Sequence, residues 1–302
     1  MTAIDRLNHM QLLEAESIHI FREVVSEFQN PVMLYSIGKD SSVMLRLAQK
    51  AFHPGPIPFP LMHVDTGYKF DEMLEFRDRY TAELGVKLIV WRNEDALAKG
   101  ANPIRLGTQR CCGLLKTQAL LDGLRAHGFD AAFGGARRDE EKSRAKERVF
   151  SFRDSAGQWD PKNQRPELWN IFNGRKHPGE HFRVFPISNW TELDVWQYIL
   201  NENIKLPELY YTHRRKIFSR NGVYLAWAPF MQLKPNEEVF ETDVRCRTIG
   251  DITCTGVTLS KAETLEEIIA EIAATRVTER GGRHDDKRSE AAMEDRKKEG
   301  YF

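Results

Sequence analysis

The sequence has little of what several classes of protein require. Its 302 residues include four cysteines, too few and too scattered for a disulfide scaffold. Lysine plus arginine and aspartate plus glutamate both number 44, so no net charge draws the chain to nucleic acid or to an acidic membrane surface. No apolar run approaches the roughly 18 residues of a membrane span, and the start lacks a signal-peptide pattern. We therefore expect a cytoplasmic protein with reduced thiols and with neither a nucleic-acid nor a membrane partner.

What the chain does contain is an alternation of short apolar runs with amphipathic segments. Spacing predicts helices over 11–28, 43–51, 73–84 and 114–124, and strands over 32–35, 61–64, 86–90 and 129–133. This alternation predicts an α/β fold with an open, mostly parallel, Rossmann-like sheet covered by helices on both faces. Ligands bind such sheets at the carboxyl ends of the strands, where polar loops follow Tyr35, Val64 and Phe133.

The regular alternation is lost beyond about Pro207, which indicates a second region. We expect a nucleotide-binding domain over 1–206 and a smaller C-terminal region over 207–302, with a strand at 223–227 and a helix at 262–274. From Arg276 onward the chain is almost wholly charged and polar, and such a tail cannot bury a core of its own.

The loop after the first strand, Ser36 to Ser42, has the composition of an anion cradle. Gly38 lets the backbone approach a ligand closely, and the amide groups that open the next helix would point at it. Lys39 adds a positive charge, while Ser36 and Ser41 add hydroxyl donors, so the loop suits a pyrophosphate. The spacing excludes the P-loop of NTPases. The alternative is a helix start that is merely capped by serine and aspartate.

Polar groups also follow the other two strands. Asp65 and Thr66 could bind an adenine amino group, a ribose or a hydrated Mg²⁺, although an ordinary turn is the alternative. After Gly134 and Gly135 come six cations within twelve residues: Arg137, Arg138, Lys142, Arg144, Lys146 and Arg148. If that segment is helical, three of these cations lie near one face and could bind a dianion. The alternative is a solvated charged helix.

The motif Ser36-x-Gly38-Lys39-Asp40-Ser41 after a strand resembles the pyrophosphate loop of the adenine-nucleotide α-hydrolase superfamily, whose members cleave between the α- and β-phosphates. A narrower resemblance runs nearly end to end, to the small-subunit (subunit 2) family of heterodimeric sulfate adenylyltransferases. It is carried by the segments 63–70, 133–144, 183–186, 189–191 and 297–302.

That resemblance implies that the chain joins ATP and sulfate into adenylylsulfate and pyrophosphate, the first step of sulfate assimilation. It implies ATP contacts from Ser36, Gly38, Lys39, Asp40, Ser41, Asp65, Thr66, Gly134 and Gly135. It implies sulfate contacts from Arg137, Arg138, Lys142 and Arg144, with Lys39, Arg137 and Arg138 as the catalytic residues. Mg²⁺ would arrive with the ATP phosphates, with Asp40 as a candidate contact, and no flavin is implied. The implied partner is a large GTPase subunit related to elongation factors, contacted through 207–302.

The cysteines bear on the runner-up function, a phosphoadenylylsulfate or adenylylsulfate reductase. Cys111-Cys112 resembles the pair with which adenylylsulfate reductases hold an iron–sulfur cluster, but a cluster needs four thiolates. Cys246 and Cys254 are separated by seven residues rather than two, and the tail has no nucleophilic cysteine. We predict structural cysteines and no iron–sulfur cluster, with a zinc or cluster site and redox sensing as alternatives. A nucleotide-binding regulatory or scaffold protein is the third functional possibility, but it would have no use for the basic cluster.

Overall fold

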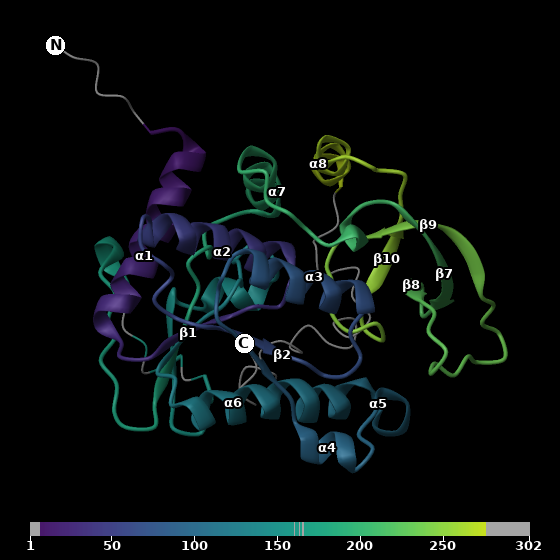
Figure 1. Cartoon of the computed structure of the whole chain (residues 1–302), viewed down its shortest axis with the longest axis horizontal. Helices are drawn as coiled ribbons and strands as arrows, with labels where there is room; N and C mark the ends of the chain where they lie inside the picture. Colours follow the sequence, from purple (N-terminus) through teal and green to yellow (C-terminus); the bar gives the residue numbers. More distant parts are fainter. Residues whose placement is uncertain (1–6, 160, 163, 165, 276–302) are drawn as a thin grey trace.

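A long amphipathic helix, α1 (His9–Glu27), brings the chain into the fold. Asn8 and Gln11 form a capping box at its start, and it buries Ile20, Phe21 and Val24 against the sheet. The computed structural model describes residues 7–159, 161–162, 164 and 166–275 (Figure 1). α1 confirms the helix predicted over 11–28.

A six-stranded sheet forms the centre of the molecule. Its order is β3 (Leu88–Trp91), β2 (Leu61–Val64), β1 (Pro31–Leu34), β4 (Ala131–Phe133), β6 (His181–Val184) and β5 (Phe150–Arg153). All neighbours pair in parallel except β5, which runs antiparallel to β6. The chain turns from one side of β1 to the other, so that β2 and β4 flank it. The sheet therefore reverses its order at β1, where binding sites in such folds form.

Helices cover both faces of this sheet, as predicted (Figure 1). One face packs against α1, α2 (Lys39–Phe52), α3 (Asp71–Glu83) and α7 (Glu192–Asn201). The other face packs against α6 (Ala119–His127), preceded by α4 (Glu94–Ala98), α5 (Pro103–Cys112) and the π-helix η1 (Gly113–Gln118). A π-helix is rare and frequently marks a functional site.

The described part of the C-terminal region, up to residue 275, contains a small closed barrel. It is built from β7 (His213–Arg220), β8 (Val223–Ala226), β9 (Phe240–Cys246) and β10 (Gly256–Leu259), followed by α8 (Leu265–Ala274). The 3-10 helix η4 (Glu208–Tyr210) leads into it, and α8 packs on α7. Barrel residues such as Ile217 and Val244 belong to the same buried cluster as the sheet. The domain division at 206/207 stays a prediction.

The basic segment after β4 is not the regular helix considered above. It forms turns followed by the 3-10 helix η2 (Lys142–Lys146), and a second 3-10 helix, η3 (Leu168–Asn170), lies further along. The backbone N–H of Arg138 donates to the carbonyl of Ser188, in the loop after β6, instead of closing a helical turn. Tertiary pairing therefore overrides the helical charge pattern.

No helix in the described ranges is both long and apolar enough to cross a membrane.

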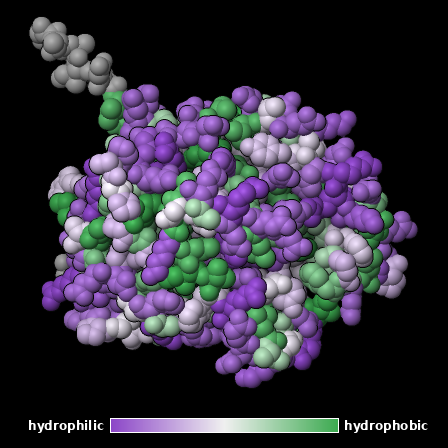
Figure 2. Space-filling view, in the orientation of Figure 1, coloured by the Kyte–Doolittle hydropathy of each residue, from purple (hydrophilic) through white to green (hydrophobic). Residues whose placement is uncertain are grey.

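The face of the molecule in Figure 2 is mostly hydrophilic, with hydrophobic side chains in scattered patches. The charged tail from Arg276 lies outside the described residues.

Candidate active site

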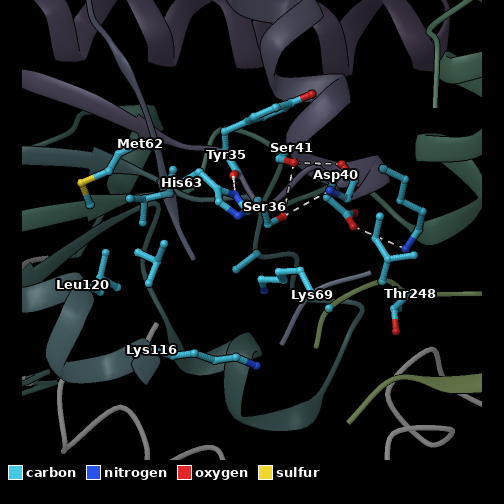
Figure 3. A pocket seen from close by; sticks show the side chains of 18 of the residues that line it. Tyr35, Ser36, Asp40, Ser41, Met62, His63, Lys69, Lys116, Leu120 and Thr248 are labelled. Atoms are coloured by element: carbon cyan, nitrogen blue, oxygen red, sulfur yellow. Dashed lines mark hydrogen bonds and ion pairs between the residues drawn. The ribbon is translucent and has the colours of Figure 1, made fainter. Parts of the chain in front are cut away.

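A pocket lies at the carboxyl ends of β1, β2 and β4, where the sheet order reverses (Figure 3). Its walls come from the loop after β1, the end of β2 and the residues that follow it, the π-helix η1 with the start of α6, the segment after β4 that includes Arg144, Tyr210 of η4, and the loop between β9 and β10. Met62 and Leu120 lie at one end of the pocket, Lys69 near its middle and Thr248 toward the other end.

The loop after β1 has features that suit the predicted anion cradle, whose binding of an anion stays a prediction. α2 begins at Lys39; its N-cap residue, Gly38, supplies no side-chain cap, and the N–H of Lys39 donates to the hydroxyl of Tyr210 at 2.8 Å. Ile37 adopts a φ of 68°, a strained conformation for a β-branched residue and one that clusters at functional sites. The hydroxyl of Ser41 donates to the carbonyl of Gly38 at 2.9 Å, and that of Ser36 donates to Ser41 at 3.3 Å. Positive helix-end charge and hydroxyl groups thus gather at one place, as an anion requires.

Two charged residues at the start of α2 connect the cradle to the segment after β4. Lys39 has no exposed surface although it lines the pocket, and its Nζ lies 3.4 Å from Oδ2 of Asp40. Arg137 donates from Nε to Oδ1 of Asp40 at 2.7 Å. A Cβ on Gly135 would lie 3.1 Å from that of Asp40, so glycine permits this close approach. Asp40 therefore holds two cations beside the cradle.

His63, at the end of β2, was not among the predicted site residues. Its Nδ1 lies 2.8 Å from the carbonyl oxygen of Tyr35, which can only accept, so Nδ1 carries the proton. Burial, and then the charge of Lys69, lowers the pKa of His63 to about 3. The ring is therefore neutral, and its Nε2 is an acceptor without a hydrogen-bond partner among the described residues, in a side chain that lines the pocket.

A second feature that the sequence did not reveal is a buried carboxylate that holds two lysines in the pocket wall. Asp251, in the β9–β10 loop, accepts from Lys69 at 2.9 Å, from Lys116 at 2.8 Å and from the hydroxyl of Thr66 at 2.8 Å. Burial alone would raise the pKa of Asp251, but the ammonium groups of Lys116 and Lys69 hold it far below its ordinary value. Thr66 is separated from Asp251 by 185 positions, so no local pattern could have paired them.

The four predicted sulfate residues have different environments. Arg144 lines the pocket and is 3% exposed, with Nε 3.2 Å from Oε2 of Glu140. Its Nη1 has no hydrogen-bond partner within the described ranges. Arg137 lies behind Asp40, and Arg138 donates to Asn189, so neither is a lining residue. The side chain of Lys142 lies outside the described part of the structure.

Three predicted ATP residues lie just behind the pocket. Asp65 accepts from the N–H of Gly67 at 2.9 Å and from Nε of Arg92 at 3.0 Å. Burial would raise the pKa of Asp65, but these donors hold it below its ordinary value. The hydroxyl of Thr66 donates to the carboxylate of Asp251. Gly134 packs against Phe185, since a Cβ at this position would lie 3.0 Å from the ring. Their direct contact with a nucleotide stays a prediction.

Comparison with known sequences gives close and nearly full-length matches. A sequence model described as the phosphoadenosine phosphosulfate reductase domain matches residues 30–257. The sulfate adenylyltransferase subunit 2 of Mycobacterium sp. (strain KMS) is 61% identical over 98% of this chain and 95% of its own length. The protein of the same name from Mycobacterium tuberculosis (strain ATCC 25177 / H37Ra) is 57% identical over 98% of this chain and 96% of its own.

Solved structures give more distant matches. Phosphoadenylyl-sulfate reductase from Candida auris is 16% identical, with a TM-score of 0.46 over 68% of this chain and 91% of that one. FMN adenylyltransferase from Candida glabrata, in complex with FMN and an ATP analogue, is 14% identical, with a TM-score of 0.48 over 69% and 64%.

Proposed function

Since the chain belongs to the sulfate adenylyltransferase subunit 2 family, we propose that it transfers the adenylyl group of ATP to sulfate and releases pyrophosphate. Membership of the family makes it an enzyme subunit with a role in sulfate activation. One observation carries the finer proposal: Lys39, Lys69, Lys116 and Arg144, from four separate segments, all line one pocket beside a pyrophosphate-type loop.

ATP fits this pocket in one direction. The end bounded by Met62 and Leu120 is apolar and suits the adenine ring, and the acceptor Nε2 of neutral His63 suits the adenine amino group. The β- and γ-phosphates would then lie against the loop of Ser36, Gly38 and Ser41 at the start of α2. Lys39 would neutralise the leaving pyrophosphate from within that loop.

Sulfate would lie among the remaining cations, with Arg144 as its principal contact and Lys69 and Lys116 beside it. Sulfate is a dianion at neutral pH, so its attack on the α-phosphorus requires no general base. The protein then contributes positioning and charge stabilisation. Arg137 acts from behind by fixing Asp40 and hence the start of α2.

The carboxylates of this pocket suit Mg²⁺ that is bound through water rather than by direct coordination. Asp40 and Glu140 line it, but each already accepts from a cation, so we propose that they hold the water shell of the ion rather than the ion itself. When bound with ATP, Mg²⁺ supplies charge neutralisation for the leaving pyrophosphate.

The subunit 2 name implies a partner, subunit 1. We propose that this partner is a GTPase related to elongation factors, because the phosphosulfate anhydride is less stable than the ATP anhydride and its synthesis needs a second source of free energy. The C-terminal region, with its charged tail, is the proposed contact.

Sulfate-dependent exchange of labelled pyrophosphate into ATP, with and without the partner and GTP, tests this proposal. We expect exchange that requires sulfate, and net adenylylsulfate formation that GTP increases. Thiol-dependent reduction of phosphoadenylylsulfate without any exchange would instead identify a reductase.

A further inference from the structure

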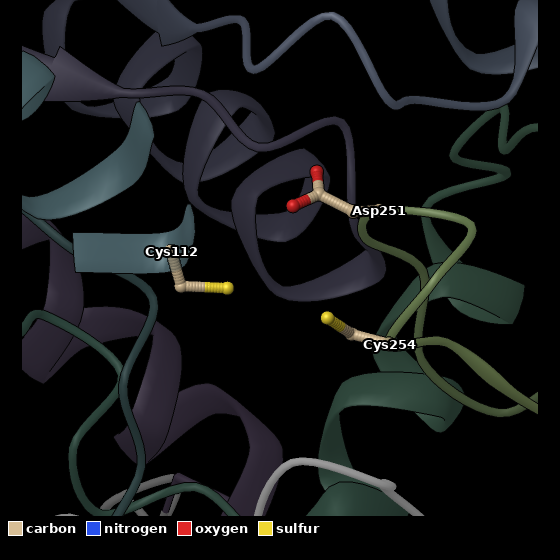
Figure 4. A group of neighbouring side chains, drawn as sticks. All are labelled: Cys112, Asp251 and Cys254. Atoms are coloured by element: carbon tan, nitrogen blue, oxygen red, sulfur yellow. The ribbon is translucent and has the colours of Figure 1, made fainter. Parts of the chain in front are cut away.

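Three side chains that can bind a metal ion converge where the barrel meets the sheet domain. Cys112 ends α5, while Asp251 and Cys254 lie in the loop between β9 and β10. The two Sγ atoms and a carboxylate oxygen lie within 4.8 Å of one another, and Figure 4 shows the side chains pointing into a common space. We propose that Cys112, Cys254 and Asp251 bind one divalent ion of borderline softness, Zn²⁺, which fastens this loop to the helix behind the pocket.

The backbone already holds these groups in place. The carbonyl of Asp251 accepts from the N–H groups of Cys254 at 3.0 Å and Thr255 at 2.9 Å, which fixes a turn carrying two of the ligands. The N–H of Ile252 donates to the carbonyl of Tyr68 at 2.9 Å and anchors that turn to the sheet domain. Cys112, the last residue of α5, lies four residues before Lys116 in the adjoining η1, and the side chains of both lie close to Asp251.

The ligand atoms match the chemistry of zinc. Thiolate sulfur and carboxylate oxygen are both ordinary zinc ligands, and three protein ligands leave a fourth tetrahedral position for water. The Asp251 carboxylate accepts two donors at Oδ1 and one at Oδ2. Since a carboxylate has about four acceptor positions, one remains on Oδ2 for a metal. An iron–sulfur cluster is a poorer fit because it takes four cysteines.

The charge balance of the site also allows a divalent ion to bind. Binding would deprotonate two thiols and release two protons for each dication bound, so the net charge of the site does not change. Lys69 and Lys116, which already neutralise Asp251, therefore need not move. The residues immediately before Asp251, Thr248 to Gly250, line the pocket, so the ion would hold that wall in place.

Metal content tests this inference independently of adenylyl transfer. The full chain, purified without chelator, is assayed for zinc. The chelator-treated protein is then titrated with Co²⁺, whose bonds to thiolates give a charge-transfer absorption band. Cys112→Ser and Cys254→Ser are the test variants. Cys246→Ser is the matched control, because Cys246 is buried in β9 outside this group.

We expect one zinc per chain and a cobalt–thiolate band in the parent and in Cys246→Ser, and at least a tenfold loss of metal affinity in both test variants. Because Cys112 is only half-buried, Cys112→Ser keeps the test open if Cys254→Ser does not fold. Absence of zinc together with absence of the cobalt band would overturn the proposal. Iron and sulfide with visible absorbance would overturn it in favour of a cluster.

Discussion

Lys39 is fully buried, yet it lies in a polar loop, next to Asp40 and at the first turn of α2. A buried ammonium group beside a helix N-terminus stabilises an anion that arrives there. We predict that Lys39→Ala lowers pyrophosphate exchange roughly ten- to a hundredfold, since a charge-assisted hydrogen bond contributes about 1.5–3 kcal/mol. Lys205→Ala is the control, because its exposed pair with Glu83 contributes little. Near-normal exchange in folded Lys39→Ala would reject the assignment.

Variants at Arg144 and Arg138 test whether sulfate binds the basic segment inside the pocket, at Arg144, or outside it, at Arg138. Arg144 is buried in the pocket wall, whereas Arg138 contacts Asn189. Arg144→Gln should weaken sulfate and competing oxyanions about ten- to a hundredfold while changing ATP binding little. Arg138→Gln should have a much smaller effect on sulfate. The competition constants of an oxyanion inhibitor in the exchange assay measure both, and a larger effect at Arg138 would place sulfate elsewhere.

His63 predicts how stability depends on pH. Its folded pKa is about 3, below the ordinary value of 6.5. Between those two pH values the unfolded chain binds a proton that the folded chain does not, so the free energy of unfolding should fall as the pH drops through this window. In His63→Gln this fall should be shallower. Denaturant unfolding from pH 7 to pH 4 measures the slope, and His177→Gln, at an exposed position, should leave it unchanged. Equal slopes in parent and His63→Gln would contradict the neutral assignment.

Among elements, the β9–β10 loop, η1 and the segment after β2 meet in one wall of the pocket. Asp251 joins all three through Thr66, Lys69 and Lys116. Asp251→Asn would leave two buried ammonium groups without their carboxylate, which costs about 3–5 kcal/mol. We expect a lower unfolding temperature and a raised KM for ATP or sulfate.

The control for this junction is Asp243→Asn in the same barrel, which removes only a partly exposed pair with Arg214. A change in unfolding temperature with unaltered KM values would make Asp251 purely structural and would remove Lys69 and Lys116 from the proposed site.

For the molecule as a whole, the proposed contact of subunit 1 with the C-terminal region can be tested by shortening the chain. The sequence over 276–302 is rich in charge and poor in apolar residues, a composition that cannot bury a core of its own. A chain that ends at Thr275 should keep the unfolding temperature of the full chain but bind subunit 1 more weakly, as measured by titration calorimetry. Unchanged affinity would move the contact to the barrel or to the sheet domain.

The sequence by itself determined the features that arise from residues close together in the chain, namely individual helices, individual strands and the loops that join them. Apolar spacing predicted α1 and the parallel strands β1 to β4, but not β6, and the composition of the Ser36 to Ser42 loop predicted an anion cradle. Both follow from contacts within one strand–loop–helix unit. The sequence also carries a local signal for the proposed metal site, since Asp251 and Cys254 are three residues apart.

Only the tertiary structure decided which charges meet. A helix over the basic segment was plausible from its charge spacing, but the Arg138 N–H pairs with Ser188 instead. Arg144 lines the pocket while Arg138 does not, because the turns after β4 point them in different directions. Asp251 reaches Thr66 across 185 positions. Such long-range pairs depend on how the barrel packs against the sheet, and packing of distant segments leaves no periodic trace in the sequence.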